Sequence, residues 1–240
     1  MKVILSQPWG GLGDNLQFTT LPHYYYLQGD DFYINSDNSY RNDEIYDMVW
    51  KSNPYVKGIT DEPANVGYPS KHAEVCHMSI RNVIKSWELV HGFDSGKDMF
   101  PPPVLYHIPK MVDAARGKIV VDFGTITFSG KYNKDKVLAF MEDNFNVEDL
   151  LLLKRKGNPT FHNSFNEKVV DRVIEYETYH DYLDILSSCK GVYCFSSGTN
   201  AVAAALNKYK MIDVHCVYHV ENFDPSWPGY FFSNVTYHEI

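Results

Sequence analysis

Short apolar runs alternate with stretches of helical spacing along the whole chain. In the first hundred residues the strand-like runs cover 3–5, 32–34 and 55–59, and the helical stretches cover 15–27, 43–50 and 78–92. In the last of these helices the apolar face consists of Ile80, Val83, Ile84, Trp87 and Val90. We expect Pro22 to kink or end the first helix, and Gly92 to end the third. Strands that alternate with helices are typical of a parallel sheet covered by helices.

The same alternation restarts after the stiff segment Pro101-Pro102-Pro103, which we interpret as a linker. Strand-like runs follow at 118–123, 149–153, 191–195 and 211–214, and helical stretches at 134–145, 179–188 and 201–206. We therefore predict an α/β fold of two Rossmann-like domains, residues 1–105 and 106–240. In such a fold we expect a ligand cleft between the domains, at the carboxyl ends of both sheets.

The first strand-like run leads into the glycine-rich turn Gly10-Gly11-Leu12-Gly13-Asp14. Glycines allow the backbone to turn sharply and a ligand to approach, and the start of the following helix offers unpaired N–H groups to an anion. The turn is not a P-loop, because no Gly-Lys-Ser/Thr follows. Nor is it the dinucleotide fingerprint, because Leu16 stands where the third glycine would be. Asp14 is then either a helix cap or an acid at the mouth of a ligand cleft.

The chain has 240 residues, of which 44% are hydrophobic, and a formal net charge of −8. This size supports a large core, and the acidic balance argues against nonspecific binding to nucleic acid or anionic membranes. Positive residues nevertheless concentrate in the second half, either as solvated ends of loops and helices or as a site for an anionic ligand such as a nucleotide diphosphate. They are Lys131, Lys134, Lys136, Lys154, Arg155, Lys156, Lys208 and Lys210.

No apolar run approaches the roughly 20 residues of a membrane-spanning helix, and the first residues do not form a signal peptide. We therefore expect no transmembrane segment and a cytoplasmic location, in a bacterium or in the host cell if a phage encodes the protein. The four cysteines are Cys76, Cys189, Cys194 and Cys216. They form no Cys-x-x-Cys pair, so we expect reduced, mostly buried thiols. His215 and His219 could share a metal on a helix, but the preceding run is typical of a strand and no acidic third ligand is evident, so we predict no metal site.

The order of these motifs resembles the bacterial lipopolysaccharide heptosyltransferases and the wider glycosyltransferase family that contains them, which has the two-domain GT-B fold. Three segments carry the likeness: the glycine-rich start at 10–22, the strand and loop at 119–125, and the helix, strand, Ser-Gly turn and Ala-rich helix at 179–206. Together they span most of the chain. The resemblance implies an inverting, metal-independent glycosyltransferase that needs no cofactor and takes a nucleotide-diphosphate sugar as co-substrate.

The resemblance places the role of general base on Asp14, within an acceptor-side domain of residues 1–105. A hydroxyl is a poor nucleophile until a positioned base takes its proton. In the donor domain of residues 106–240, hydroxyl, lysine and backbone N–H groups would hold the leaving nucleotide diphosphate. The residues expected to bind donor or phosphate are Gly11, Gly13, Thr125, Thr127, Lys131, Ser197, Gly198, Thr199 and Asn200. No two aspartates stand two residues apart, so the Asp-x-Asp metal clamp of the other large glycosyltransferase fold is absent.

The chain departs from the family pattern in its last motif. The family usually shows Asp-(Ser/Thr)-Gly followed three residues later by His, whereas this chain has Ser196-Ser197-Gly198 and then Ala201. For this reason we do not carry over ADP-heptose as the donor. The chain is also short for the family, with room for only a trimmed acceptor domain.

The acceptor is open at this stage. It is either a saccharide or glycolipid, or a hydroxymethylated base in phage DNA, which Trp9 and the tyrosines at 24–26 could hold in a flipped state. Two other functions also fit the residues. One is a non-catalytic module that binds a nucleotide sugar, and the other is a nucleotide-sugar epimerase, which would need no acceptor.

Overall fold

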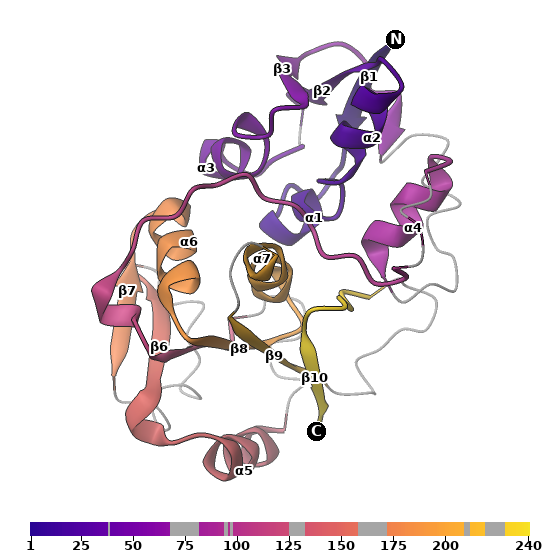
Figure 1. Ribbon diagram of the computed structural model, residues 1–240. Coiled ribbons are helices and arrows are strands. Elements are labelled where there is room, and N and C mark those ends of the chain that lie inside the picture. The colour runs from indigo at the N-terminus through magenta and orange to yellow at the C-terminus, as the bar shows by residue number, and fades with distance from the viewer. Residues whose placement is uncertain are drawn as a thin grey trace. The chain divides into compact units, whose positions relative to one another are not determined.

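The computed structural model describes residues 1–37, 39–67, 82–93, 96, 98–124, 133–157, 172–208, 212–218 and 229–240. The chain divides into two compact units, one made of Met1–Ile108 with Pro225–Ser233 and the other of Pro109–Asp224 with Asn234–Ile240. Each unit contains a parallel sheet with helices between its strands (Figure 1). The predicted α/β class with two Rossmann-like units is confirmed.

The sheet of the first unit has the strand order β3-β2-β1-β4, and all its pairings are parallel. Its strands are β1 (Lys2–Ser6), β2 (Asp31–Asn35), β3 (Val56–Thr60) and β4 (Val66–Gly67). Its helices are α1 (Leu12–Leu16), α2 (Leu21–Leu27), α3 (Asp43–Tyr46), the π-helix η1 (Asp47–Lys51) and α4 (Val83–Val90). From β1 the chain first builds outward to β2 and β3 and then returns to the other side of β1, so the order reverses between β1 and β4.

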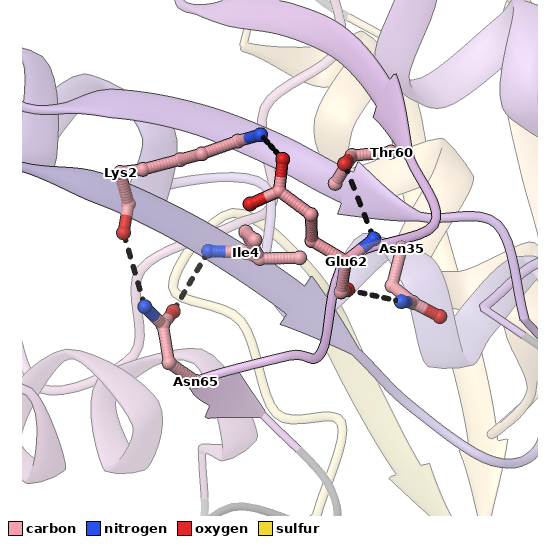
Figure 2. A network of polar contacts seen from close by, with 6 residues as sticks. All are labelled: Lys2, Ile4, Asn35, Thr60, Glu62 and Asn65. Atoms are coloured by element: carbon pink, nitrogen blue, oxygen red, sulfur yellow. Dashed lines mark hydrogen bonds and ion pairs between the residues drawn. The ribbon is translucent and has the colours of Figure 1, made fainter.

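Strand β4 is only two residues long, and the side chain of Asn65 extends its ladder along β1 (Figure 2). The Asn65 amide oxygen accepts the backbone N–H of Ile4 at 2.8 Å, and its amide nitrogen donates to the carbonyl of Lys2 at 3.0 Å. The same loop is tied to β2, since the Asn35 amide donates to the carbonyl of Glu62 at 2.8 Å. Lys2 and Glu62 also form an ion pair. Polar side chains thus replace the missing strand length at this edge of β1.

The helix predicted at 15–27 is two helices in the structure. Helix α1 ends at Leu16, and α2 begins at Leu21 with Pro22 in its first turn, where the missing N–H of proline costs no hydrogen bond. The helix predicted at 78–92 begins at Val83, because Asn82 caps it by accepting the N–H of Lys85 at 2.7 Å. Residues 78–81 lie outside the described part of the chain.

The sheet of the second unit has the order β10-β9-β8-β5-β6-β7, again entirely parallel. Its strands are β5 (Ile119–Asp122), β6 (Leu150–Arg155), β7 (Val173–Tyr176), β8 (Gly191–Phe195), β9 (Asp213–Tyr218) and β10 (Thr236–Glu239). Its helices are α5 (Lys134–Asn144), α6 (Tyr179–Ser188) and α7 (Gly198–Asn207), with the short 3₁₀ turns η3 (Asp113–Ala115) and η4 (Val147–Asp149). Helix α5 covers one face of this sheet, and α6 and α7 cover the other (Figure 1).

Strand β8 lies at the centre of this unit, and all five of its residues are buried. Toward α5, Tyr193 stacks on Phe140 with the ring centroids 5.6 Å apart. On the other face, the Ala-rich helix α7 is buried from Thr199 to Leu206, because small side chains allow it to lie close to the sheet. The predicted helix 179–188 and strand 191–195 are confirmed to the residue.

The structure of this unit differs from the prediction in the following elements. Helix α7 starts at Gly198 and not at 201, because the Ser197 side chain caps it. The strand predicted at 149–153 continues through Lys154 and Arg155, because β6 pairs along β7 to that point. Strands β7 and β10 were not predicted.

Candidate functional site

Both units have a point where the strand order reverses, between β1 and β4 in the first and between β5 and β8 in the second. At such a switch point the loops that leave two neighbouring parallel strands diverge, and ligands of α/β sheets bind outside the carboxyl ends of the strands there. The glycine-rich turn follows β1, and the Ser-Gly turn at 196–198 follows β8. The sequence-predicted site segments therefore lie at these switch points, each within its own unit.

The turn after β1 is fastened by Gln7, whose side chain is fully buried. Its amide oxygen accepts the N–H groups of Trp9 and Gly10 at 3.0 Å each. Its amide nitrogen donates to the carbonyl of Ser39. One amide side chain therefore satisfies three backbone groups, which fixes the course of the turn.

Gly10 and Gly11 are required by close contacts. Gly10 has a φ of +65°, and a Cβ there would lie 2.8 Å from the backbone nitrogen of Arg41. Arg41 donates that N–H to the carbonyl of Gly10 at 2.8 Å. At Gly11 a Cβ would lie 2.6 Å from a carboxylate oxygen of Asp14. The glycines thus provide room for Arg41 and for the acid.

Asp14 occupies the third position of α1, and its carboxylate accepts the N–H of Gly11 at 3.1 Å. Burial raises the pKa of Asp14 above its ordinary value, while the Gly11 hydrogen bond and the charge of Arg41 lower it. The net result is a partly desolvated carboxylate with an increased affinity for a proton. The geometry contains the cap contact considered above, and the raised pKa is the property expected of a general base.

Behind Asp14, Asn15 joins the turn to the rest of the unit. Its amide nitrogen donates to the carbonyl of Gly11 at 2.8 Å, and its amide oxygen accepts the indole N–H of Trp50 at 2.7 Å. Leu16, which stands in place of the third glycine of a dinucleotide fingerprint, is fully buried in the core. A large apolar side chain in that position anchors α1, and α1 has only five residues.

At the switch point of the second unit, Asp122 joins the loop after β5 to the first turn of α7. Its carboxylate accepts the N–H of Gly124 at 2.8 Å and the hydroxyl of Thr199 at 2.7 Å. The phenol of Tyr182 in turn donates to the Thr199 hydroxyl oxygen at 2.9 Å. The side chain of Thr199 is therefore engaged within the protein, and its backbone N–H donates to Ser197 at 3.2 Å.

The other predicted donor-binding residues fall into three groups. Gly13, Ser197 and Gly198 are partly exposed, whereas Asn200 is fully buried and donates to the phenol of Tyr237 at 3.4 Å. Thr125, Thr127 and Lys131 lie outside the described residues.

The basic residues at the end of β6 and directly after it are engaged by their own neighbours. Lys156 forms an ion pair with Glu177, and the guanidinium of Arg155 lies 5.0 Å from the ring centroid of Tyr179. Both groups are therefore held at the carboxyl edge of the sheet, beside the start of α6.

Among the residues that the structure describes, no three His, Cys, Asp or Glu side chains are grouped to hold a metal ion. His215 lies in strand β9 and contacts His238 of β10 with their ring nitrogens 2.9 Å apart, while His219 lies outside the described residues. The predicted buried, free state is confirmed for Cys189, Cys194 and Cys216, and Cys76 is not described. No helix of the described chain has the length and apolar character needed to span a bilayer.

Sequence reasoning missed four residues that build these sites, namely Gln7, Arg41, Asp122 and Tyr182. Asp122 had a detectable signal in the sequence. It is an acid that directly follows the apolar run 119–121 and stands two residues before Gly124. Arg41 and Tyr182 had none, because their contacts join segments far apart in sequence.

Structure comparison identifies the fold as that of GT-B glycosyltransferases. The chain matches TibC, an iron-containing dodecameric glycosyltransferase from enterotoxigenic E. coli, with 16% identity and a TM-score of 0.61. The match covers 98% of this chain and 62% of TibC, so the chain spans less than two thirds of that protein. A second TibC structure is described as a heptosyltransferase in complex with ADP-D-β-D-heptose.

Two further structures share the fold over more of their own length. A glycosyl transferase of family 9 from Veillonella parvula matches with 10% identity and a TM-score of 0.62, over 100% of this chain and 85% of its own. The E. coli heptosyltransferase WaaC, crystallised with ADP, matches with 12% identity and a TM-score of 0.58, over 100% of this chain and 93% of its own. No protein-family model matches the sequence, and no curated protein matches it either.

Proposed function

We propose that this chain is an inverting, metal-independent glycosyltransferase that moves a sugar from a nucleotide-diphosphate sugar to an acceptor hydroxyl. The observation that carries this function is the position of Asp14, a partly desolvated carboxylate fixed in a glycine turn at the switch point of the first unit. The fold shared with TibC, the family 9 enzyme and WaaC supports the same reaction class. WaaC and TibC were each solved with a nucleotide diphosphate or its sugar bound.

In this reaction Asp14 acts as the general base. As the acceptor oxygen forms its bond to the anomeric carbon, the hydroxyl proton moves to the Asp14 carboxylate. The bond between the anomeric carbon and the diphosphate oxygen breaks, and the nucleotide diphosphate leaves with the electron pair. Attack opposite to the leaving group inverts the anomeric configuration. A base whose pKa is raised retains more driving force for this proton transfer than an ordinary aspartate.

The leaving diphosphate is bound by residues of the second unit, with Gly11 and Gly13 shaping the turn that carries the base. The helix start at Gly198, together with Ser197 and Asn200, supplies N–H groups that favour negative charge, and Thr199 holds this turn through its bonds to Ser197 and Asp122. Thr125, Thr127 and the positive charge of Lys131 complete the set. Lysine and helix dipole thus take the place of a divalent cation.

The acceptor is a saccharide, a glycolipid or a hydroxymethylated base in DNA. Of the aromatic residues that could hold a flipped base, Trp9 and Tyr26 are 42% and 53% exposed. Tyr25 is buried and belongs to the core. The two exposed rings support contact with either a sugar or a base, since both present a flat apolar face.

A thermal-shift screen tests the donor first. ADP, UDP, GDP and their sugars, ADP-heptose included, are added to the full chain, because a ligand that binds the native state raises its Tm by mass action. Transfer by wild type and by Asp14→Asn is then measured with lipid-linked saccharides and with hydroxymethylated DNA. We expect the variant to bind the nucleotide and to lose transfer.

Four outcomes contradict the proposal. If no nucleotide stabilises the wild type, the donor site does not exist. If the wild type binds a nucleotide sugar but Asp14→Asn transfers as well as the wild type on an active acceptor, Asp14 is only the helix cap. Binding without turnover on any acceptor would favour a binding module, and a changed sugar released without an acceptor would identify an epimerase.

A further inference from the structure

The carboxylate of Asp122 hydrogen bonds to both segments that meet at the switch point of the second unit, the chain after β5 and the start of α7. It is the last residue of β5 and pairs in register with Cys194 of β8. One of its oxygens accepts the N–H of Gly124, in the loop after β5, at 2.8 Å. The other accepts the hydroxyl of Thr199, in the first turn of α7, at 2.7 Å.

The direction of the hydrogen bonds in this cluster is fixed by its chemistry. A carboxylate only accepts, so Thr199 gives its single proton to Asp122 and must accept the proton of Tyr182. Tyr182 and Thr199 are 3% and 7% exposed, so water does not compete for these bonds. Burial, followed by the charge of Asp122, raises the pKa of Tyr182 well above its ordinary value, which keeps the phenol a donor.

The loop backbone lies directly against the carboxylate. A Cβ at Gly124 would come within 2.9 Å of an Asp122 oxygen, so a larger residue would displace the carboxylate. The contact therefore depends on a glycine on one side and a hydroxyl on the other.

We propose that Asp122 is the positioning residue of the nucleotide-diphosphate site, a role that rests on the proposed function. Its two hydrogen bonds hold Gly124, directly after β5, and the N-terminal turn of α7 in the arrangement that binds the diphosphate. The negative carboxylate makes no contact with phosphate itself. It acts through the start of α7, because the direction of the N–H groups there decides how well they stabilise an anion, while its bond to Gly124 fixes where the chain leaves β5.

A set of full-chain variants separates this role from general stability. Asp122→Ala removes the hydrogen bonds of the carboxylate to Gly124 and to Thr199, and Thr199→Val removes the second of them. Asp122→Asn keeps one acceptor oxygen. Thr199→Ser restores the hydroxyl and so tests whether the loss in Thr199→Val is rescued. Glu175→Gln is the control for charge, because Glu175 is an exposed carboxylate on β7 of the same unit. Binding of ADP and of UDP is measured by calorimetry, and KM for the nucleotide sugar and kcat are measured where transfer is observed.

We expect Asp122→Ala and Thr199→Val to weaken binding of the nucleotide diphosphate by about tenfold or more, with KM raised by a similar factor and kcat changed less. Amide hydrogen exchange without ligand is expected to rise at Gly124 and in the first turn of α7 in both variants. Thr199→Ser is expected to restore both readouts, and Glu175→Gln to change neither.

The failures of this inference and of the proposed function are distinguishable. If the wild type binds a nucleotide, and Thr199→Val has the same affinity for it and the same amide hydrogen exchange, Asp122 does not have the proposed role. The glycosyltransferase proposal then remains intact. If the wild type binds neither ADP nor UDP and no other nucleotide stabilises it, both fall. If Asp122→Ala does not fold, the pair Thr199→Val and Thr199→Ser decides, because it leaves the carboxylate in place.

Discussion

Trp50 donates its indole N–H to the amide oxygen of Asn15 at 2.7 Å. The amide nitrogen of Asn15 donates in turn to the carbonyl of Gly11 at 2.8 Å. Trp50 is fully buried and Asn15 is 1% exposed. A residue of the π-helix η1 thus fixes the turn that carries Asp14, through the side chain next to it. The candidate base is therefore oriented from inside the core and not from the solvent side.

We predict that Trp50→Phe destabilises the first unit and also lowers transfer. The substitution leaves the buried oxygen of Asn15 without its donor, which costs about 1–3 kcal/mol. Urea unfolding measures the loss, and kcat/KM measures its effect on the site. The matched control is Trp87→Phe, because Trp87 donates in the same way to Gln17 at 2.9 Å, at the C-cap of α1 and not within the turn at 10–14.

Comparable destabilisation in both variants, with transfer lowered mainly in Trp50→Phe, is the expected pattern. An equal fall in kcat/KM in the two variants would mean that Asn15 has no particular link to the reaction. Asn15→Ala is expected to be the more severe change, since it removes the hydrogen bonds to Trp50 and to Gly11 together.

We predict that Gly11→Ala abolishes transfer with little change in the fold. The backbone at Gly11 has φ −71°, which any residue adopts, so the effect comes from the added Cβ alone. That atom would lie 2.6 Å from the Asp14 carboxylate and would displace it. Gly29→Ala serves as the control, because its φ of +82° costs about 1 kcal/mol of strain with no atom nearby. Activity retained in Gly11→Ala would show that the position of the carboxylate does not matter.

We predict that Asp14→Asn is at least as stable as the wild type at pH 7, although it loses transfer. Burial raises the pKa of Asp14 in the folded chain, so the folded state holds the proton more tightly than the unfolded state. As pH rises from the ordinary aspartate pKa through the raised pKa of the folded chain, the wild type therefore loses stability. An amide avoids that loss and still accepts the N–H of Gly11.

The free energy of unfolding of the two proteins at pH 7 and at pH 4 measures this difference. A marked destabilisation of Asp14→Asn at pH 7 would instead assign Asp14 the role of a helix cap. The acid limb of the wild-type kcat/KM profile provides a second check, because it should lie above the value of about 4 for an ordinary aspartate.

Elements with strong local signals were predictable from the sequence. Strand β8 is a continuous apolar run, and the preceding helix α6 starts at a capping box in which Thr178 and Asp181 satisfy each other's backbone N–H groups. By contrast, β10 is the polar sequence Thr-Tyr-His-Glu and exists because β9 offers it a partner. Strand β4 has two residues and depends on the side chain of Asn65. Such elements are defined by tertiary pairing and carry no periodic pattern.

The same difference between local and long-range contacts decides which residues of the candidate sites could be predicted. Asp14 was found because its glycines are adjacent to it in sequence. The contact between Asp122 and Thr199 spans 77 residues and depends on the register of β5 with β8, which no local pattern reports. The sequence also predicted hydroxyls for phosphate binding, without indicating that the hydroxyl of Thr199 is engaged with a carboxylate.

A histidine pair in the second unit gives its stability a defined pH dependence. The ring nitrogens of His215 and His238 lie 2.9 Å apart, and the rings stack with centroids 5.2 Å apart. Phe140 contacts His238 with a centroid distance of 4.8 Å. Burial lowers the pKa of both histidines, and the charge of His215 lowers the pKa of His238 further.

We predict that the wild type loses stability between pH 7.5 and pH 5 more steeply than a variant carrying His215→Asn and His238→Asn. The unfolded chain takes up protons near pH 6.5, whereas the folded pair resists them, so the pair contributes its full stability above that pH and loses it as pH falls through the lowered values. Two amides can still hydrogen bond to each other but do not titrate. Urea unfolding across this range measures the slopes, and equal slopes in the two proteins would show that the contact between the rings does not control acid stability.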